Sequence, residues 1–492
     1  MPDLLPFLGF SLLLLSVVGL GEGLRSWGGW RPEASRRLVH ALTGVAVALS
    51  PPLFASPGPI YVLAILFVGV NMASVARGWL PGMHGIARRS FGTVTFPLAL
   101  IVALYTCWTL DPGRIHILQI AFLVLALSDP LASIVGTSLR RPGRIFVGIN
   151  EKSVAGSSAF FVSAFILIFA GLTLLGGFGL SPAGILLAAL VTAAIATGAE
   201  ALATTGWDNL FIVVAVIAPL AFLQRQPGAV GELGIALAVA VIFLGAAYAV
   251  RFLTLDGAIA ASGLAFVVLG FGGLAWTVPA FTFFVLSSLL SKVGRRRKAA
   301  ASRLAAKGST RDSGQVYANG GVGWILILAF VFFPDATFLY WAFAGAFAAA
   351  AADTWGTEIG TFVRGRTRLI WSGRRVEPGT SGGVSVAGTL GALAGAGVVF
   401  ASLVPFAGPY LDGIGLPLAA VLVVGGGFVA SLVDSLLGAT AQALYRDGAS
   451  GALTERASGA VVRGWRWITN DRVNVACTVA GAVLPVLMLA FR

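Results

Sequence analysis

Long apolar runs recur along almost the whole chain, and short polar segments separate them. Each run holds about twenty residues, the length at which an α-helix crosses the roughly 30 Å hydrocarbon core of a bilayer. The first run, Leu4 to Leu20, lacks a basic leader and a small-residue cleavage site, so we expect it to remain as a helix. The pattern predicts an all-α, polytopic integral membrane protein.

The apolar runs correspond to about sixteen membrane-spanning helices. Their expected residue ranges are 4–22, 38–56, 58–76, 91–110, 114–138, 153–176, 182–203, 207–224, 228–250, 253–275, 277–292, 315–333, 336–358, 384–404, 414–442 and 473–491. A polar break at Gln224–Gly228 has half of these helices on each side, which predicts two membrane domains, 1–226 and 227–492. The halves share no evident repeat, so fusion of two different units fits better than an inverted-repeat transporter.

Composition and charge agree with this architecture. Hydrophobic residues make up 57% of the chain and charged residues 11%, more apolar material than one soluble core could use. With the N-terminus outside, all of the 33 Lys and Arg except Arg114, Arg225 and Arg492 fall in or beside cytoplasmic loops. Topology therefore accounts for the net charge of +13, and no nucleic-acid partner is expected. The basic stretch Lys292–Arg311 is interpreted as a topology signal that contacts lipid headgroups, although steering of an anionic substrate would use the same charges.

Few ionisable side chains interrupt the apolar runs of the first half. Such side chains are costly at membrane depth and usually serve a function. They are His40, Asp129, Glu200 and Asp208, the last followed by Asn209. All lie toward the predicted cytoplasmic ends of their helices. Acidic residues in this position could hold the Mg²⁺ that accompanies a nucleotide.

The segment Lys152–Ser157 has the features of a phosphate site. It opens a predicted helix, whose N-terminus offers free N–H groups and the positive end of the helix dipole, while Lys152 adds a point charge. Ser153 and Ser157 add hydroxyl donors, and Gly156 lets the backbone approach a phosphate. The same residues also fit a structural role, in which Ser153 caps the helix, Gly156 packs against a neighbouring helix and Lys152 anchors at the interface.

Polar clusters of the second half lie on the same predicted side of the membrane. They are Lys307–Gln315 with Asn319, Ala352–Gly360, Pro378–Gly383, Asp434–Ser435 and Thr469–Asn474. Within them, Asp353 and Thr357 share a helical face, with Glu358 one step further around. Capping and interhelical hydrogen bonds explain any single cluster, but their common side favours a functional site. No pattern in the sequence supports a serine-hydrolase elbow, Walker A loop, zinc His-Glu-x-x-His helix or Rossmann fingerprint.

Several pieces of the first half occur in an order and spacing typical of one membrane family. They are Arg36–His40, Ser90–Thr93, Ser128–Gly136, Lys152–Ser157, and Glu200 with Asp208–Asn209. Over residues 35–225 the chain thereby resembles the CTP-dependent lipid-alcohol kinases, the group that contains phytol kinase and dolichol kinase. In that family the Lys-Ser-x-x-Gly-Ser piece is associated with the CTP site. Pro130–Leu131 departs from the small residues usual in the family.

The second half resembles a different membrane family, known for plant phytyl-phosphate kinase. The pieces that carry the resemblance are Arg311–Gly320, Ala352–Gly360, Gly382–Ser385, Asp434–Thr440 and Asn470–Asn474. They cover about residues 230–490.

Together the two resemblances imply a bifunctional salvage kinase that converts an isoprenoid alcohol, such as phytol or geranylgeraniol, to its monophosphate and then to its diphosphate. The expected phosphate donor is CTP, or another nucleoside triphosphate in the second step, with Mg²⁺ as cofactor. In the first site, Lys152, Ser153 and Ser157 would bind the CTP phosphates, and Asp129 and Asp208 would hold Mg²⁺ or orient the alcohol oxygen. The other substrate-binding candidates there are His40, Gly156, Glu200 and Asn209.

In the second site, the expected metal ligands are four acids, Asp353, Glu358, Asp434 and Asp471. Asp353 and Glu358 are also the catalytic candidates. Lys307 and Arg311 are candidates for binding phosphate, and Arg suits a bidentate grip. The remaining substrate-binding candidates are Gln315, Asn319, Ser381, Gly382 and Asn474.

Two other activities stay open from the sequence. A transporter or flippase of a lipid phosphate would carry charges at the membrane midplane, whereas these charges lie toward one face. A cytidylyltransferase-like membrane enzyme would also use CTP, and its release of pyrophosphate would separate it from a kinase.

Overall fold

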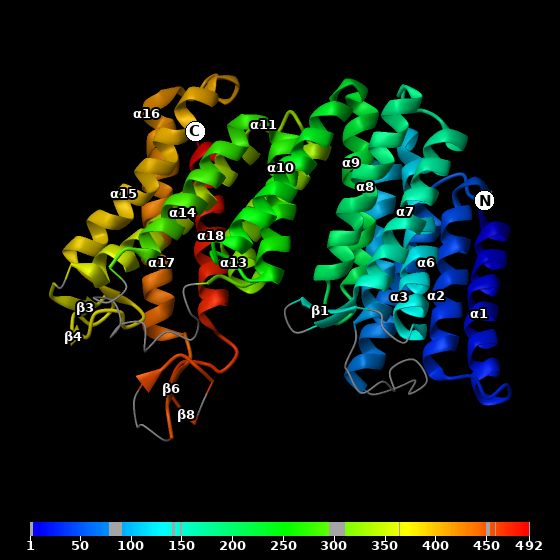
Figure 1. Ribbon diagram of the computed structural model, residues 1–492, viewed down its shortest axis with the longest axis horizontal. Helices are drawn as coiled ribbons and strands as arrows, with labels where there is room; N and C mark the ends of the chain where they lie inside the picture. The colour runs from blue at the N-terminus through cyan, green and yellow to red at the C-terminus, as the bar shows by residue number, and fades with distance from the viewer. Residues whose placement is uncertain are drawn as a thin grey trace. The chain divides into compact units, whose positions relative to one another are not determined.

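The computed structural model describes residues 3–77, 91–139, 143–147, 150–294, 310–363, 365–448, 453–457 and 459–491. Most of these residues are helical, which confirms the predicted all-α membrane fold. The chain forms two compact units, Met1–Leu237 and Ala238–Arg492, called here the first and second units (Figure 1). The division falls within a helix, and the boundary expected at 226/227 lies just before that helix.

In its described residues, the first unit consists of helices and a β-hairpin. Its elements are α1 (Leu4–Ser26), α2 (Pro32–Leu49), α3 (Gly58–Arg77), α5 (Gly92–Leu104) with a π-helical turn at Tyr105–Thr109, α6 (Ile115–Ser138), β1 (Arg144–Val147), β2 (Asn150–Ser153), α7 (Val154–Leu175), α8 (Pro182–Leu202), α9 (Asp208–Arg225) and α10 (Val230–Ala249), which continues into the second unit.

The second unit combines long helices with two small sheets. Its elements are α11 (Leu255–Lys292), α13 (Ser313–Phe332), α14 (Phe338–Phe362), β3 (Thr367–Leu369), β4 (Arg375–Val376), β5 (Gly383–Val384), α15 (Val386–Leu403), α16 (Gly415–Ala420), a π-helical turn at Val421–Gly425, α17 (Gly426–Thr440), β6 (Leu444–Arg446), β7 (Leu453–Thr454), β8 (Ala460–Arg463) and α18 (Asn470–Ala490). The antiparallel strand orders are β4-β3-β5 and β7-β6-β8.

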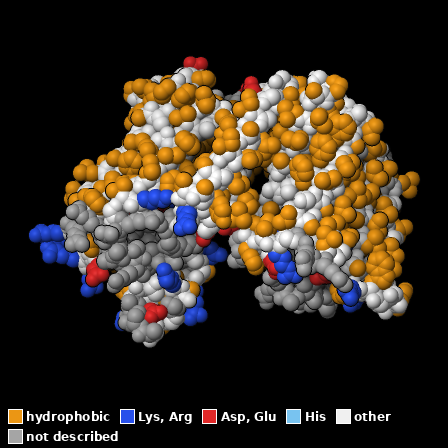
Figure 2. All heavy atoms as spheres, viewed as in Figure 1, with side chains coloured by type: hydrophobic (Ala, Val, Ile, Leu, Met, Phe, Trp, Pro, Cys, Tyr) orange, Lys and Arg blue, Asp and Glu red, His pale blue; other side chains and the backbone are white. Residues whose placement is uncertain are grey.

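Thirteen helices in the described part of the chain are long and apolar enough to cross a membrane, roughly the predicted number. Helices α2 and α14 are not among the thirteen. The first carries three charged residues near its start, Glu33, Arg36 and Arg37, and the second contains polar and aromatic residues, among them Trp341 and Asp353, that lower its mean hydropathy. Figure 2 shows hydrophobic side chains over the helix flanks of each unit, as lipid contact requires.

Two predicted boundaries differ from the structure for identifiable reasons. The helix expected at 38–56 runs from Pro32 to Leu49, because Pro fits the first helical turn and a Pro-Pro pair follows the helix end. The helices expected at 253–275 and 277–292 are continuous as α11, except at Gly273, where φ is 62° and the helical conformation breaks.

Small residues determine how closely the helices of the second unit pack. Every residue of α14 from Leu339 to Ala352 is buried. A Cβ atom added at Gly345 would overlap the carbonyl oxygen of Gly481 in α18, and one added at Gly427 in α17 would lie 2.8 Å from the Ala348 Cβ atom. The Ala and Gly stripes therefore let α14 lie at the centre of its unit.

Candidate active site

A cavity of about 1380 Å³ lies within the first unit, between α1, α2, α3, α5, α6, α7 and the start of α9. All the candidate site residues predicted in the first half line it. They are His40, Asp129, Lys152, Ser153, Gly156, Ser157, Glu200, Asp208 and Asn209. The fold thus brings together side chains that are up to 169 positions apart in the sequence, from His40 to Asn209.

Close contact between α2 and α6 positions His40 beside Asp129. Gly44 lies one turn after His40, and a Cβ atom there would be only 2.5 Å from the Cβ atom of Ala126. The resulting approach lets the Nε2–H group of His40 donate to the Leu125 carbonyl oxygen at 3.1 Å. The same nitrogen lies 3.9 Å from Asp129 Oδ2, and the Phe96 ring packs edge-on against the imidazole.

The N-terminus of α7 lies against α6 through a second close contact. Ser153 caps α7, since its hydroxyl oxygen accepts a hydrogen bond from the Gly156 N–H at 3.0 Å. A Cβ atom at Gly156 would lie 2.9 Å from the Ala132 carbonyl oxygen, and one at Gly136 would lie 2.5 Å from Ser153 Oγ. The structural roles expected for Ser153 and Gly156 are therefore present, and both residues still border the cavity.

Lys152 precedes this cap on strand β2, opposite Ile145, whereas the sequence placed it at a helix start. Its ammonium group donates to the Glu200 carbonyl oxygen at 2.9 Å and forms an ion pair with the Glu200 carboxylate. An ammonium group has three N–H donors, so one remains for a phosphate oxygen. Glu200 is only 7% exposed, and its Oε2 atom has no hydrogen-bond partner among the described residues.

The turn between α8 and α9 positions Asp208 and Asn209. Thr205 and Gly206 both have positive φ values, 53° and 93°. The turn is fastened to the start of α5, because the Phe91 N–H donates to the Thr205 carbonyl oxygen at 2.8 Å. The Asn209 amide also donates to the Gly92 carbonyl oxygen at 2.8 Å, so it holds two elements together at the cavity wall.

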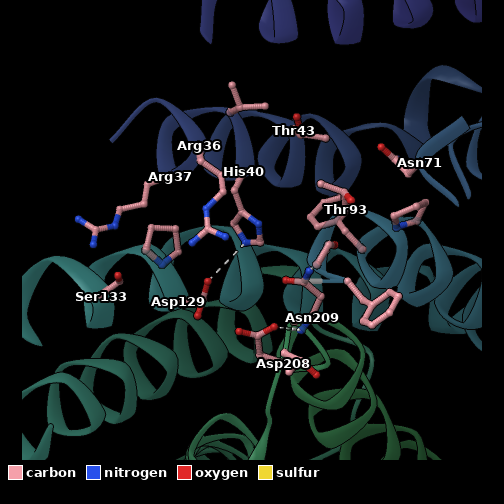
Figure 3. Close-up of a pocket in the computed structure, with 18 of the residues that line it drawn as sticks. Arg36, Arg37, His40, Thr43, Asn71, Thr93, Asp129, Ser133, Asp208 and Asn209 are labelled. Carbon is pink, nitrogen blue, oxygen red and sulfur yellow. Dashed lines mark hydrogen bonds and ion pairs between the residues drawn. The ribbon is translucent and has the colours of Figure 1, made fainter. Parts of the chain in front are cut away.

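Two carboxylates face the charged end of the cavity. Figure 3 shows Asp129 and Asp208 pointing into the same space, with Arg36 and Arg37 on the adjoining helix. The part of the chain that the structure describes has no group of three or more His, Cys, Asp or Glu side chains arranged for a metal ion. However, Mg²⁺ usually binds one or two carboxylates together with substrate phosphates and water, so this pair and the unpartnered Glu200 oxygen fit a magnesium–nucleotide complex.

The opposite end of the cavity is an apolar arm. Its walls come from α1, α2, α3 and α5, and include Phe10, Leu14, Val47, Ile60 and Leu100. Along α2, Arg36 to Val47 corresponds to about 16 Å of helix rise, which includes both the charged end and the arm. The lining of the arm has the chemistry for a hydrocarbon chain.

Two cavity residues, Asn71 and Thr93, were not predicted as site residues from the sequence. Asn71 interrupts the apolar run of α3, so the rule that identified Asp129 and Glu200 also applies to it. Thr93 lies in a family-like segment whose first residue, Ser90, is outside the described residues.

In the second unit, the carboxyl groups of Asp353 of α14 and Asp434 of α17 lie close enough to interact electrostatically. Two neighbouring carboxylates repel each other unless a proton or a bound cation lies between them. The Oδ1 atom of Asp434 is buried and has no hydrogen-bond partner among the described residues. This pair of carboxyl groups fits Mg²⁺ with a phosphorylated substrate.

Arg311 lies beside these acids. Burial lowers the pKa of its guanidinium group from the ordinary value, and the charges of Glu358 and Asp353 oppose that shift. The guanidinium carbon also lies 5.7 Å from the centre of the Phe283 ring. The other predicted phosphate-binding residue, Lys307, falls outside the described residues.

Ser381 and Gly382 form a tight turn beside α17. Gly382 has φ of 79°, and its backbone packs against the Ser435–Ala439 segment. The Ser381 hydroxyl donates to the Glu455 carboxylate, and the Arg463 guanidinium donates to the Gly438 carbonyl oxygen at 2.8 Å. Glu455 and Arg463 were not predicted, because they lie in a long connection where the sequence indicated no strands.

The other predicted residues of the second unit lie at helix starts. Gln315 and Asp312 form a reciprocal capping box on α13, and the Asn319 amide donates to the Gln315 carbonyl oxygen at 2.9 Å. Asp471 and Asn474 lie in the first turns of α18. Gln315 and Asn319 are therefore engaged within α13, and their role in substrate binding stays a prediction.

Comparison with known proteins gives a family match for the second unit. Residues 238–482 match the family described as "Integral membrane protein DUF92". The chain is 30% identical over 242 residues to an uncharacterised membrane protein of Methanocaldococcus jannaschii, a match that covers 48% of this chain and 86% of that protein. No solved structure matches.

Two named relatives also align with the chain. A phytol kinase of Synechocystis is 29% identical over 182 residues, which cover 37% of this chain and 75% of that enzyme. The chloroplast protein VTE6 of Arabidopsis thaliana is 30% identical over 149 residues, which cover 30% of this chain and 38% of that protein.

Proposed function

The chain belongs to the integral membrane protein family DUF92, and from this membership and the cavity of the first unit we propose that it is a membrane-embedded kinase for an isoprenoid alcohol. The observation that best supports this proposal is a cavity that has a charged end, with Lys152, Asp129 and Asp208, and an apolar arm. A lipid alcohol and a nucleotide need such a combination. The name of one relative, phytol kinase, supports the same class of substrate.

The first unit catalyses formation of the monophosphate. The hydroxyl oxygen of the alcohol attacks the γ-phosphorus of CTP, the bond from that phosphorus to the β,γ-bridging oxygen breaks, and CDP leaves. The hydroxyl proton passes to the carboxylate of Asp129 or Asp208. Lys152 and the N–H groups at the start of α7 bind phosphate oxygens, and His40 orients Asp129. Mg²⁺ held by the other carboxylate of this pair would neutralise the negative charge of the nucleotide phosphates.

The second unit phosphorylates the monophosphate to the diphosphate. Arg311 binds the phosphate of the incoming lipid, and Asp353 and Asp434 would hold Mg²⁺ with the nucleotide, which would neutralise phosphate charge, with Glu358 alongside. Fusion of the two activities in one chain shortens the path of the lipid monophosphate from the first reaction to the second. The basic side chains at the charged end, Arg36, Arg37 and Arg144, support a cytoplasmic position for the first site.

An assay with differently labelled nucleotides tests the reaction class. The full chain, purified in detergent, is incubated with phytol or geranylgeraniol, Mg²⁺ and CTP labelled at the γ- or the α-phosphorus, and the lipids are separated by chromatography. A kinase transfers label to lipid only from γ-labelled CTP, and the diphosphate appears after the monophosphate. Lipid label from α-labelled CTP, with pyrophosphate release, would show a cytidylyltransferase instead. No labelled lipid from CTP or ATP would count against a kinase and in favour of lipid-phosphate transport.

A further inference from the structure

Asn71 is a buried polar residue in the otherwise apolar middle of α3. It is 6% exposed and lines the cavity of the first unit. Its side chain forms no hydrogen bond with any residue in the part of the chain that the structure describes. A buried amide without a partner is unfavourable, so a bound molecule is expected to supply the missing hydrogen bonds.

Thr93, in the first turn of α5, also has a polar side-chain atom without a hydrogen-bond partner. Its hydroxyl oxygen is buried without a hydrogen-bond partner among the described residues, and the residue lines the same cavity. Figure 3 shows Asn71, Thr93 and Thr43 on the side of His40 that faces away from Arg37 and Ser133. The cavity therefore has a group of uncharged polar side chains separate from its charged end.

These three residues mark the level at which the cavity changes from polar to apolar. On α2, the cavity-lining residues pass from His40 through Thr43 to Val47. The same order occurs from Asn71 through Phe67 to Ile60 on α3, and from Thr93 through Phe96 to Leu100 on α5. The spacings of three, four, seven or eleven residues keep each series on one face of its helix.

A molecule that spans this level has its polar group beside Asn71 and Thr93 and its hydrocarbon beyond them. Resting on the proposed kinase function, we propose that Asn71 and Thr93 bind the hydroxyl group of the lipid alcohol and orient its oxygen for phosphorylation. A hydroxyl group both donates and accepts, as do an amide side chain and a threonine. A nucleobase has similar hydrogen-bonding groups, but it carries no hydrocarbon chain to fill the arm.

Binding can be tested without catalysis. The unfolding temperature of the full chain in detergent is measured with phytol and with the saturated hydrocarbon of the same branched skeleton, which lacks the hydroxyl group. The wild-type chain is expected to be stabilised more by phytol, whereas Asn71→Leu and Thr93→Val should respond equally to both. Thr192→Val is the matched control, because Thr192 is another buried hydroxyl without a partner among the described residues but is not among those that line the cavity. Equal shifts with both molecules in the wild-type chain would overturn the inference.

Steady-state kinetics distinguish an effect on alcohol binding from an effect on CTP binding. Asn71→Leu is expected to raise the KM for the alcohol about tenfold, the worth of one good hydrogen bond, and to leave the KM for CTP unchanged. An increase confined to the KM for CTP would overturn the assignment in favour of nucleobase binding. If the wild-type chain phosphorylates no alcohol, the proposed function fails, while the unfolding comparison still decides whether these residues bind a hydroxyl group.

Discussion

The two units use their buried carboxylates differently. In the first unit Glu200 is paired with Lys152, and Asp129 lies 3.9 Å from the His40 ring. In the second unit Asp353 and Asp434 lie next to each other, and Arg311 lies beside Asp353. Glu200 is therefore compensated by a side chain of its own unit, whereas the Asp353–Asp434 pair requires a proton or a cation from outside.

The two units also differ in how closely their helices pack. The helices of the first unit surround an open cavity, and glycines such as Gly44, Gly136, Gly156 and Gly171 make close contacts between its helices. In the second unit α14 is buried over most of its length against α15, α17 and α18 through small residues. The helices around the cavity of the first unit are therefore less closely packed, which leaves a space the size of a lipid. The following experiments test this contrast, beginning with the largest expected effect.

Removing the charge of Lys152 should affect folding and activity together. Lys152→Met leaves the Glu200 carboxylate buried without its cation, which costs about 3 kcal/mol of unfolding free energy. Monophosphate formation should also be lost. Combining Lys152→Met with Glu200→Leu should restore stability but not activity, which thermal unfolding and the lipid kinase assay would measure. Full stability of the single variant would show that the ion pair does not maintain the first unit.

The carboxylate pair of the second unit should behave in the opposite way. In Asp353→Asn the amide N–H can donate to the Asp434 carboxylate, so the two groups no longer repel each other and stability should change by less than about 1 kcal/mol. Diphosphate formation should nevertheless fall by about 100-fold, and the monophosphate should accumulate.

Asp335→Asn is the matched control for this change, because Asp335 lies in the connection before α14 and is not among the candidate site residues. Titration with Mg²⁺ completes the comparison: the second step should need a higher concentration in Asp353→Asn than in the wild-type chain. Normal diphosphate formation by Asp353→Asn would remove this pair from the proposed second site.

Glycine substitutions test the packing contrast on a smaller scale. Gly345→Ala places a methyl group against the Gly481 carbonyl oxygen and should destabilise the second unit by about 3 kcal/mol. Gly156→Ala should cost about 1 to 2 kcal/mol, because its contacts include the Ser153 side chain, which can move. Gly397→Ala and Gly198→Ala are the controls, since no atom lies within 4 Å of a Cβ atom at either position. Equal effects of Gly345→Ala and Gly397→Ala on the unfolding temperature would contradict the role assigned to α14.

The helices could be predicted from the sequence because lipid imposes the same requirement on every span. A run of twenty apolar residues forms a helix whatever it packs against, so even the interruption of α11 near Gly273 was expected within a few residues. The hairpin that carries Lys152 was not predicted, since four-residue strands in a polar connection have no clear periodicity.

Site residues were predictable where a charge interrupts an apolar run, as at Asp129 and Glu200. Glu455 and Arg463 lie in a polar connection, where charges are ordinary and carry no such signal. The pairing of Asp353 with Asp434 depends on the packing of α14 against α17, which local sequence does not encode. The sequence pattern thus identifies ionisable residues that are unfavourable in a membrane, and the fold determines which of them lie in contact.

The smallest expected effect concerns the length of the apolar arm, which only the first unit is proposed to have. Phe10 is buried, lines the arm far from the charged end, and packs edge-on against Phe54 with ring centres 5.8 Å apart. Phe10→Leu shortens the side chain at this point, so longer alcohols should fit better. We expect the ratio of kcat/KM for geranylgeraniol to that for farnesol to rise about threefold, the effect of a small change in an apolar pocket.

A control on the same helix makes this result specific. Leu12 is 66% exposed on the flank of α1, so Leu12→Ile should leave the ratio unchanged. Conversion of the labelled monophosphates to diphosphates should keep its chain-length preference in Phe10→Leu, because that step belongs to the second unit. A parallel change in both steps would mean that one site selects the chain for both reactions, and the division of labour between the two units would have to be abandoned.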